Sequence, residues 1–175
     1  MSNLRLSIVF YVAGMPFNGD TLKEKSLGGS ETAGLCMARE MAARGHDVIV
    51  FSNTETASGE PSLKPGRYDG VLYLPINEFP SYSMLTAIDV LIVQRIPQVF
   101  TIPAKSKINI LWMHDLALKR QRNEFRGSLW NIDEVWALSD FHKKQISDIY
   151  GVPDKLFWKT RNGIDPVRPS AVAEG

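Results

Sequence analysis

Apolar runs alternate with helix-like segments along most of the 175-residue chain. Seven short runs are almost continuously apolar and rich in β-branched or aromatic residues, as strands covered on both faces are. These runs are Leu4–Val12, Asp47–Ser52, Gly70–Leu74, Asp89–Val93, Ile108–Trp112, Glu134–Ala137 and Leu156–Thr160. The pattern predicts a mainly parallel sheet of about seven strands, with Trp112, Trp136 and Trp158 in the core.

The segments between these strands have the spacing of amphipathic helices. In the first of them Ala33, Met37 and Met41 share one stripe, and Gly45 supplies a stop. The predicted helices are Ser30–Arg44, Pro80–Ala87, Leu116–Trp130 and Ser139–Tyr150. Strands that alternate with helices predict an α/β fold, a doubly wound sheet with right-handed crossovers and helices on both faces.

Two stretches fit neither pattern. Thr54–Arg67, with scattered Gly, Ser and Pro, is interpreted as an exposed connection. Ala13–Gly29 is longer than the usual loop between a strand and a helix, which is typical of a functional or mobile loop. Beyond Asp165 the composition is that of a linker. We therefore expect one domain over residues 1–165 and a tail over residues 166–175.

Composition narrows the classes of function. A formal net charge of +1 produces no strong electrostatic field that would attract nucleic acid or a membrane. Binding to either partner would need a local patch of positive charge. The single cysteine, Cys36, excludes an internal disulfide and a cysteine-based zinc site, and the spacing of the histidines matches no common metal-ligand set. No apolar run is long enough to span a bilayer, and the N-terminus has no signal pattern. We expect a cytoplasmic protein.

Polar residues follow the ends of most predicted strands. Open parallel sheets bind ligands outside the carboxyl ends of their strands. The polar residues at these ends are Glu31, Asn53, Arg95, His114, Asp115, Ser139, Asp140 and Asn162. Every strand must end in something polar, so a structural interpretation and a shared binding site both stay open.

Gly28 and Gly29 lie just before the helix that is predicted to begin at Ser30. Two glycines let the backbone approach a ligand closely, and the free N–H groups of a helix start attract an anion. The alternative is a flexible turn with a helix cap. Glu31 favours that alternative, because a carboxylate in the first turn already satisfies the helix end. The pattern is neither the dinucleotide fingerprint nor the P-loop.

His114 is the only histidine between an apolar strand and a carboxylate. A histidine at a strand terminus can orient a substrate hydroxyl or transfer a proton near neutral pH. The alternative is a histidine that caps the next helix or is satisfied in the core. His46 lies at the opposite end of the sheet and is interpreted as structural, and His142, on a lysine-rich helix, as solvated.

The predicted helix Leu116–Trp130 is basic. Its cations are Lys119, Arg120, Arg122 and Arg126. A solvated face is the commoner explanation of such a pattern. Contact with an anionic acceptor, or with an acidic membrane surface, is the alternative.

Four stretches together resemble the N-terminal domain of GT-B-fold glycosyltransferases, in the large retaining group called glycosyltransferase family 4. They are Gly28–Glu31 with Leu35–Val48, Leu111–Asp115, Asp133–Ser139 and Asn162–Asp165. Their order and spacing match across almost the whole chain. The resemblance implies a Rossmann-like domain that forms one half of a GT-B fold and mainly holds the acceptor. The tail would lead to a C-terminal donor-binding domain that this chain lacks.

The resemblance also implies roles for individual residues. Gly28, Gly29 and Ser30 would bind the donor diphosphate, and His114 would be the catalytic residue near the donor sugar. The residues expected to line the cleft or hold the acceptor are Glu31, Arg95, Asp115, Ser139 and Asn162. The implied enzyme is a retaining hexosyltransferase that moves a hexose from a nucleotide sugar to a glycan or lipid-linked acceptor. It needs no metal or other cofactor, and the isolated domain is expected to fold but to transfer little.

Two other functions stay open. The domain could be a non-catalytic module that binds a glycan or a protein through Leu116–Trp130. It could also be half of another GT-B-fold enzyme, such as a nucleotide-sugar epimerase. Nucleic acid is not an expected partner, and peripheral contact with the inner face of the membrane through the four basic residues above is the remaining alternative.

Overall fold

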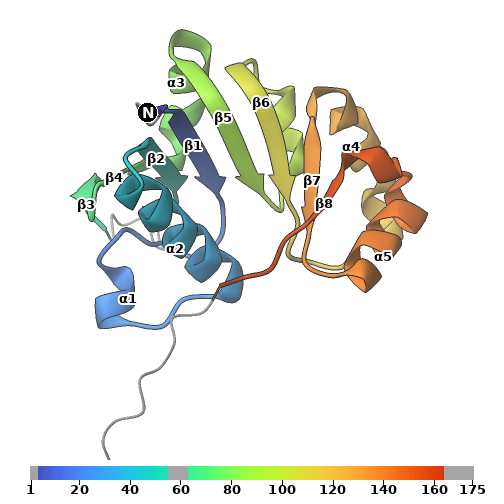
Figure 1. The fold of residues 1–175 in the computed structure, drawn as a ribbon, viewed down its shortest axis with the longest axis horizontal. Helices are drawn as coiled ribbons and strands as arrows, with labels where there is room; N and C mark the ends of the chain where they lie inside the picture. The colour runs from blue at the N-terminus through green and yellow to red at the C-terminus, as the bar shows by residue number, and fades with distance from the viewer. Residues whose placement is uncertain (1–3, 55–62, 164–175) are drawn as a thin grey trace, which may run out of the picture.

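The computed structural model describes residues 4–54 and 63–163, which form one sheet with helices on both sides (Figure 1). The sheet has eight strands in the order β3-β4-β2-β1-β5-β6-β7-β8. Every pair is parallel except β3 with β4. The prediction of a Rossmann-like doubly wound α/β fold is confirmed.

Each predicted strand has a counterpart in the structure, and so do three of the four predicted helices. The strands are β1 (Ser7–Val12), β2 (Asp47–Ser52), β3 (Gly66–Tyr68), β4 (Val71–Pro75), β5 (Ala87–Gln94), β6 (Lys105–Trp112), β7 (Glu134–Ala137) and β8 (Phe157–Lys159). The α-helices are α1 (Thr21–Glu24), α2 (Gly29–Ala43), α3 (Phe79–Leu85), α4 (Arg122–Ser128) and α5 (Asp140–Tyr150). Short 3-10 helices are η1 (Ile76–Glu78), η2 (Pro97–Thr101), η3 (Lys119–Gln121), η4 (Leu129–Asn131) and η5 (Asp154–Leu156).

The direction of the crossovers decides which helix covers which face. From β1 the chain steps to β2 and β4 on one side, and from β5 it steps through β6 and β7 to β8 on the other. Right-handed crossovers therefore place α2 on one face and α3, α4 and α5 on the opposite face (Figure 1). Strands β1 and β5, where the direction reverses, are hydrogen-bonded neighbours. Ligands bind at such a switch point in open parallel sheets.

Both faces of the central strands are buried, which explains their continuous apolar sequence. On the α2 face, Phe10 and Val12 of β1 pack with Leu35 of α2. On the opposite face, Val9 of β1 belongs to the cluster that includes Phe125 of α4. Because both faces of β1 are covered, the positions after Ser7 are all apolar or aromatic.

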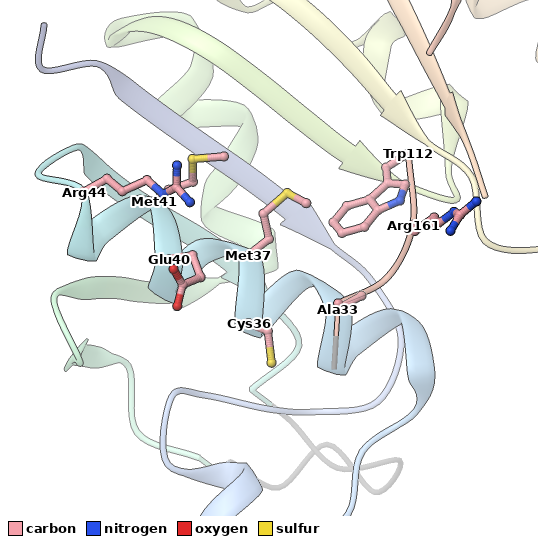
Figure 2. A pocket seen from close by; sticks show the side chains of 9 residues that line it. Ala33, Cys36, Met37, Glu40, Met41, Arg44, Trp112 and Arg161 are labelled. Carbon is pink, nitrogen blue, oxygen red and sulfur yellow. The ribbon is translucent and has the colours of Figure 1, made fainter. Parts of the chain in front are cut away.

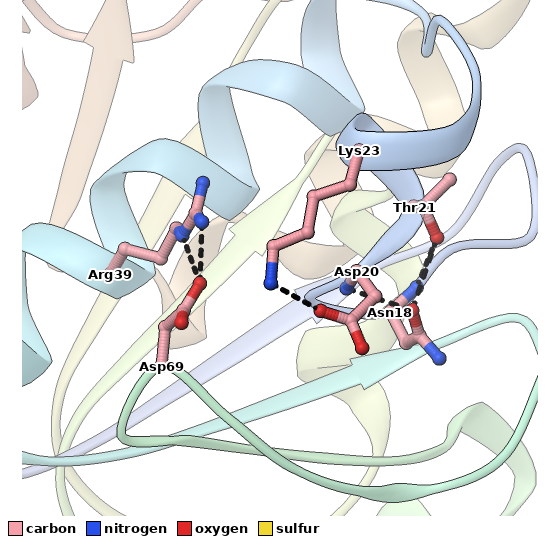
Figure 3. Close-up of polar contacts among 6 residues, drawn as sticks. All are labelled: Asn18, Asp20, Thr21, Lys23, Arg39 and Asp69. Carbon is pink, nitrogen blue, oxygen red and sulfur yellow. Dashed lines mark hydrogen bonds and ion pairs between the residues drawn. The ribbon is translucent and has the colours of Figure 1, made fainter.

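The long connection between β1 and α2 is anchored rather than open. Phe17 is completely buried, and its carbonyl accepts a hydrogen bond from Ser52 Oγ at 2.8 Å. Figure 3 shows the Asn18 side chain turned toward Thr21, whose hydroxyl donates to Asn18 Oδ1 at 3.2 Å. Lys23 pairs with Asp20 at 2.7 Å in the same turn. These contacts hold the connection, which includes the one-turn helix α1, against the end of β2.

The prediction of a continuous helix over Leu116–Trp130 is wrong. The segment is divided into η3, α4 and η4, and in α4 only Phe125 and Ser128 are buried. One large apolar anchor, followed by Gly127, supports only two turns of α-helix. The anchor itself is firm, because the Phe125 ring stacks on Tyr150 with centroids 4.3 Å apart.

The structure differs from the sequence prediction at two other places. The connection predicted over Thr54–Arg67 ends in the start of strand β3, while its residues 55–62 lie outside the described part of the chain. Trp158 is exposed rather than in the core, because β8 is the last strand of the sheet. Trp112 is buried as predicted, and Trp136 packs edge-on against it and is half-buried. The predicted tail, residues 166–175, also lies outside the described residues.

We predict that Phe125→Ala lowers the free energy of unfolding by about 3–5 kcal/mol, because it leaves a cavity beneath α4. Urea denaturation followed by circular dichroism measures this. Phe141→Ala is the matched control, since the Phe141 side chain is 69% exposed and should cost little. Equal losses for the two variants would contradict the packing of α4 on α5.

Candidate functional site

The carboxyl ends of β1, β5 and β6 form one rim, and the start of α2 lies on it. Gly28 is the N-cap of α2, one residue earlier than the sequence pattern predicted. Arg95 directly follows β5, and its backbone N–H donates to the carbonyl of Trp112, the last residue of β6. His114 and Asp115 come just after β6. The twin-glycine turn and His114 therefore open onto the same rim.

Arg95 connects the start of α2 to the end of β6. Its Nε donates to Asp115 Oδ2 at 2.6 Å. Its Nη1 lies 3.5 Å from Ser30 Oγ and 3.8 Å from Glu31 Oε1. Four of the predicted site residues thus belong to one charged network on the rim.

Glu31 is a buried structural carboxylate rather than a residue that lines an open cleft. Its side chain is only 4% exposed. Oε1 accepts the backbone N–H of Met15 at 3.2 Å, and Oε2 accepts the Ser30 hydroxyl at 3.0 Å. A buried carboxylate needs such donors and a nearby cation, and Arg95 is that cation. Glu31 therefore ties the β1–α2 connection to the start of the helix.

The Glu31 carboxylate also explains two glycines. A Cβ at Gly14 or Gly28 would overlap its oxygens, so a side chain at either position would displace the Glu31 carboxylate from its buried contacts. Gly29 is different, because a Cβ there would meet nothing within 4 Å. Packing therefore accounts for Gly28, while Gly29 faces open space at the first turn of α2 and leaves that turn accessible to a ligand.

His114 is held in its neutral form. Its ring packs on Trp112 with centroids 4.7 Å apart, and Nε2 is buried without a hydrogen-bond partner among the described residues. Burial lowers the pKa of His114 to about 4, although the nearby Asp115 carboxylate acts in the opposite direction. A neutral imidazole can exchange hydrogen bonds with a hydroxyl, but it gives no charge to a phosphate near neutral pH.

A buried amide, which the sequence pattern did not single out, lies close to the histidine. Gln94 ends β5 and pairs in register with Trp112. Its Oε1 and Nε2 have no hydrogen-bond partner among the described residues, and neither does Trp112 Nε1. Gly34 of α2 approaches the Gln94 amide closely, since a Cβ there would lie 3.0 Å from Nε2. In the sequence, the sign of this buried amide was a polar residue, Gln94, directly after the apolar run DVLIV.

His142 is buried, so the prediction of a solvated side chain is wrong. Its Nδ1 accepts the backbone N–H of Leu138 at 3.3 Å, which leaves Nε2 to donate to the carbonyl of Asp115 at 2.9 Å. His142 therefore joins the chain after β7 to the chain after β6. In the sequence, the position of His142 in the first turn of a helix that directly follows a strand was the sign that it could be buried. His46, interpreted as structural, accepts the N–H of Leu6 at the other end of the sheet.

The remaining predicted residues form no hydrogen bond or ion pair with this network within the described part of the chain. Ser139 caps α5, accepting the backbone N–H of His142 at 3.1 Å, and is exposed. Asp140 pairs with Lys159, which holds the pKa of that carboxyl below its usual value. Asn162 is exposed and follows β8. The structure therefore connects Ser30, Glu31 and Asp115 through Arg95, but it does not bring Ser139 or Asn162 into this network.

Two pockets flank the rim. One, of about 470 Å³, lies on the α4 side, and its lining includes Arg95, Asp115, Met113, Phe125 and Tyr150. The other, of about 450 Å³, runs along the flank of α2. Figure 2 shows Met37 and Trp112 on its walls. The first pocket shares two charged side chains with the rim network.

The described residues contain no group of three His, Cys, Asp or Glu side chains placed to hold a metal ion. No protein-family model matches the chain, and no curated protein matches it either.

Arg95 has a left-handed backbone, with φ of 68°. Arg95→Ala and Arg95→Gly remove the same guanidinium, but only glycine relieves this conformation. We predict that the glycine variant is more stable than the alanine variant by about 1 kcal/mol, measured by urea denaturation. An alanine variant that is as stable as the glycine variant would show that the backbone at Arg95 is not strained.

The low pKa of His114 predicts a pH dependence. Between pH 6.5 and about 4 the unfolded chain binds a proton at this histidine and the folded protein does not. Stability should therefore fall as the pH is lowered through that window, and less so in His114→Gln. Imidazole NMR signals should show His114 titrating near pH 4, whereas a midpoint near 6.5 would contradict its burial.

Proposed function

We propose that this chain is the N-terminal, acceptor-side half of a retaining GT-B-fold glycosyltransferase. The reaction is transfer of a hexose from a nucleotide sugar to a glycan or lipid-linked acceptor. The main support is that an accessible helix start and a neutral histidine share one rim, beside the switch point between β1 and β5. The sequence resemblance motivates the reaction class, and the geometry is compatible with it.

In this proposal the first turn of α2 binds the donor diphosphate. The open position at Gly29 lets a phosphate approach the backbone N–H groups that a helix leaves unpaired at its start. Negative charge builds up on the diphosphate as it leaves the sugar. Fixed donors at that place stabilise the charge without reorganisation, and the reaction then needs no metal ion.

His114 positions the sugar. Because the imidazole is neutral near pH 7, it can accept from or donate to a sugar hydroxyl without attracting the diphosphate itself. Trp112 packs on one side of the ring and restricts its orientation. The acceptor would occupy the 470 Å³ pocket, where the exposed Asp115 carboxylate can accept a hydrogen bond from the attacking hydroxyl.

Transfer also requires a second wall for the cleft. The rim described here offers backbone donors and a histidine on one side of the donor, and we propose that a donor-binding domain closes the other side. Correct relative placement of two reactants contributes roughly 7–11 kcal/mol to catalysis. The 175-residue chain alone is therefore expected to transfer very little.

We predict that His114→Ala lowers the turnover number of the protein, as its gene encodes it, by roughly 100-fold. Nucleotide release with a panel of nucleotide sugars and acceptors measures this. His46→Ala is the control, because His46 lies at the amino end of the sheet and should leave turnover unchanged.

Two results would count against the proposal. An unchanged rate in His114→Ala would remove this residue from the reaction. A changed sugar released without any acceptor would instead identify an epimerase.

A further inference from the structure

The segment over residues 119–131 has one buried face and one exposed face. Phe125 and Ser128 point inward to the core. Lys119, Arg122, Arg126 and Trp130 are all exposed and follow one another at intervals of three, four and four residues. Arg122 and Arg126 are four residues apart and share one face of α4, while Lys119 in η3 and Trp130 in η4 flank them along the chain. We call these four exposed residues the outer stripe.

The cations of this segment are free. Within the described part of the chain, none of the four basic residues at positions 119, 120, 122 and 126 forms an ion pair. On the neighbouring α5, by contrast, Lys143 pairs with Asp154 and Lys144 pairs with Asp148. Glu124 is the one acidic side chain of the segment, and it accepts a hydrogen bond from Gln98. The outer stripe is thus a local positive surface on a chain of net charge +1.

Large apolar side chains lie beside these cations. Trp130 is 92% exposed, and Leu116 and Leu118 are also exposed. Next to Trp130 is a pocket of about 700 Å³, in which Arg126 and Lys155 provide charge and neighbouring leucines provide apolar wall. This pocket adjoins the starts of β7 and β8, at the opposite end of the sheet from the candidate site.

We propose that the outer stripe docks on an anionic lipid bilayer. The cations would contact lipid phosphates, and the Trp130 indole would enter the region between headgroups and acyl chains, which tryptophan prefers. A solvated face would account for the lysine and arginines, but it does not account for an indole exposed to this extent. No described helix is long and apolar enough to cross a membrane, so the contact would be peripheral. The inference does not depend on the proposed transferase activity.

The test is co-sedimentation of the 175-residue chain with two kinds of vesicle. One kind is pure phosphatidylcholine, and the other is an equal mixture of phosphatidylcholine and phosphatidylglycerol. We expect binding to the mixed vesicles only, and the double variant Arg122→Glu/Arg126→Glu should lower the partition coefficient at least about 10-fold. Trp130→Ser should weaken binding several-fold, including at a salt concentration that screens the charges.

The matched control is Lys25→Glu/Lys64→Glu, which makes the same change in net charge at exposed positions outside this segment. It should retain vesicle binding, and circular dichroism checks that all variants fold. Equal loss in both double variants, or equal binding to both kinds of vesicle, would overturn the proposal. The proposal would also be overturned if the wild type did not bind the mixed vesicles but did bind a labelled single-stranded oligonucleotide, and if Arg122→Glu/Arg126→Glu abolished that binding.

Discussion

The parallel pairing of β1 with β5 is the constraint on which the rest of the site depends. The two strands are about eighty residues apart in sequence, yet Val12 and Gln94 are register partners. This pairing reverses the direction of the crossovers, so that α2 covers one face and the later helices cover the other. It also brings the start of α2 beside Arg95 and the end of β6. Without it the twin-glycine turn and His114 would share no rim.

A buried carboxylate divides this rim into structural and accessible parts. Glu31 has two backbone or hydroxyl donors and Arg95 nearby, and it accounts for the glycines at positions 14 and 28. Gly29 and the uncharged His114 are what remain available to a ligand. Two interpretations of the turn, as a helix cap and as an anion site, are therefore compatible. The helix cap explains the glycine at position 28, and anion binding is the role that we propose for Gly29.

Local sequence was enough to predict the sheet, because continuous apolar runs are what strands buried on both faces require. It was not enough where a distant element decides burial. His142 was predicted to be solvated from its lysine neighbours, but the chain after β6 covers it. Trp158 was predicted in the core, but its strand ends the sheet. The same limit applies to the site: the sequence indicated its rim, whereas the Glu31–Arg95–Asp115 network depends on three segments meeting in space.

In the proposed function, the start of α2 and the residues after β6 bind one ligand together. Hydrogen–deuterium exchange of the protein as its gene encodes it, with and without a saturating nucleotide sugar, tests this most directly. We predict slower exchange in peptides that contain Gly28–Glu31 and in those that contain Trp112–Asp115. Protection confined to the amino ends of the strands, with both of these segments unchanged, would contradict it.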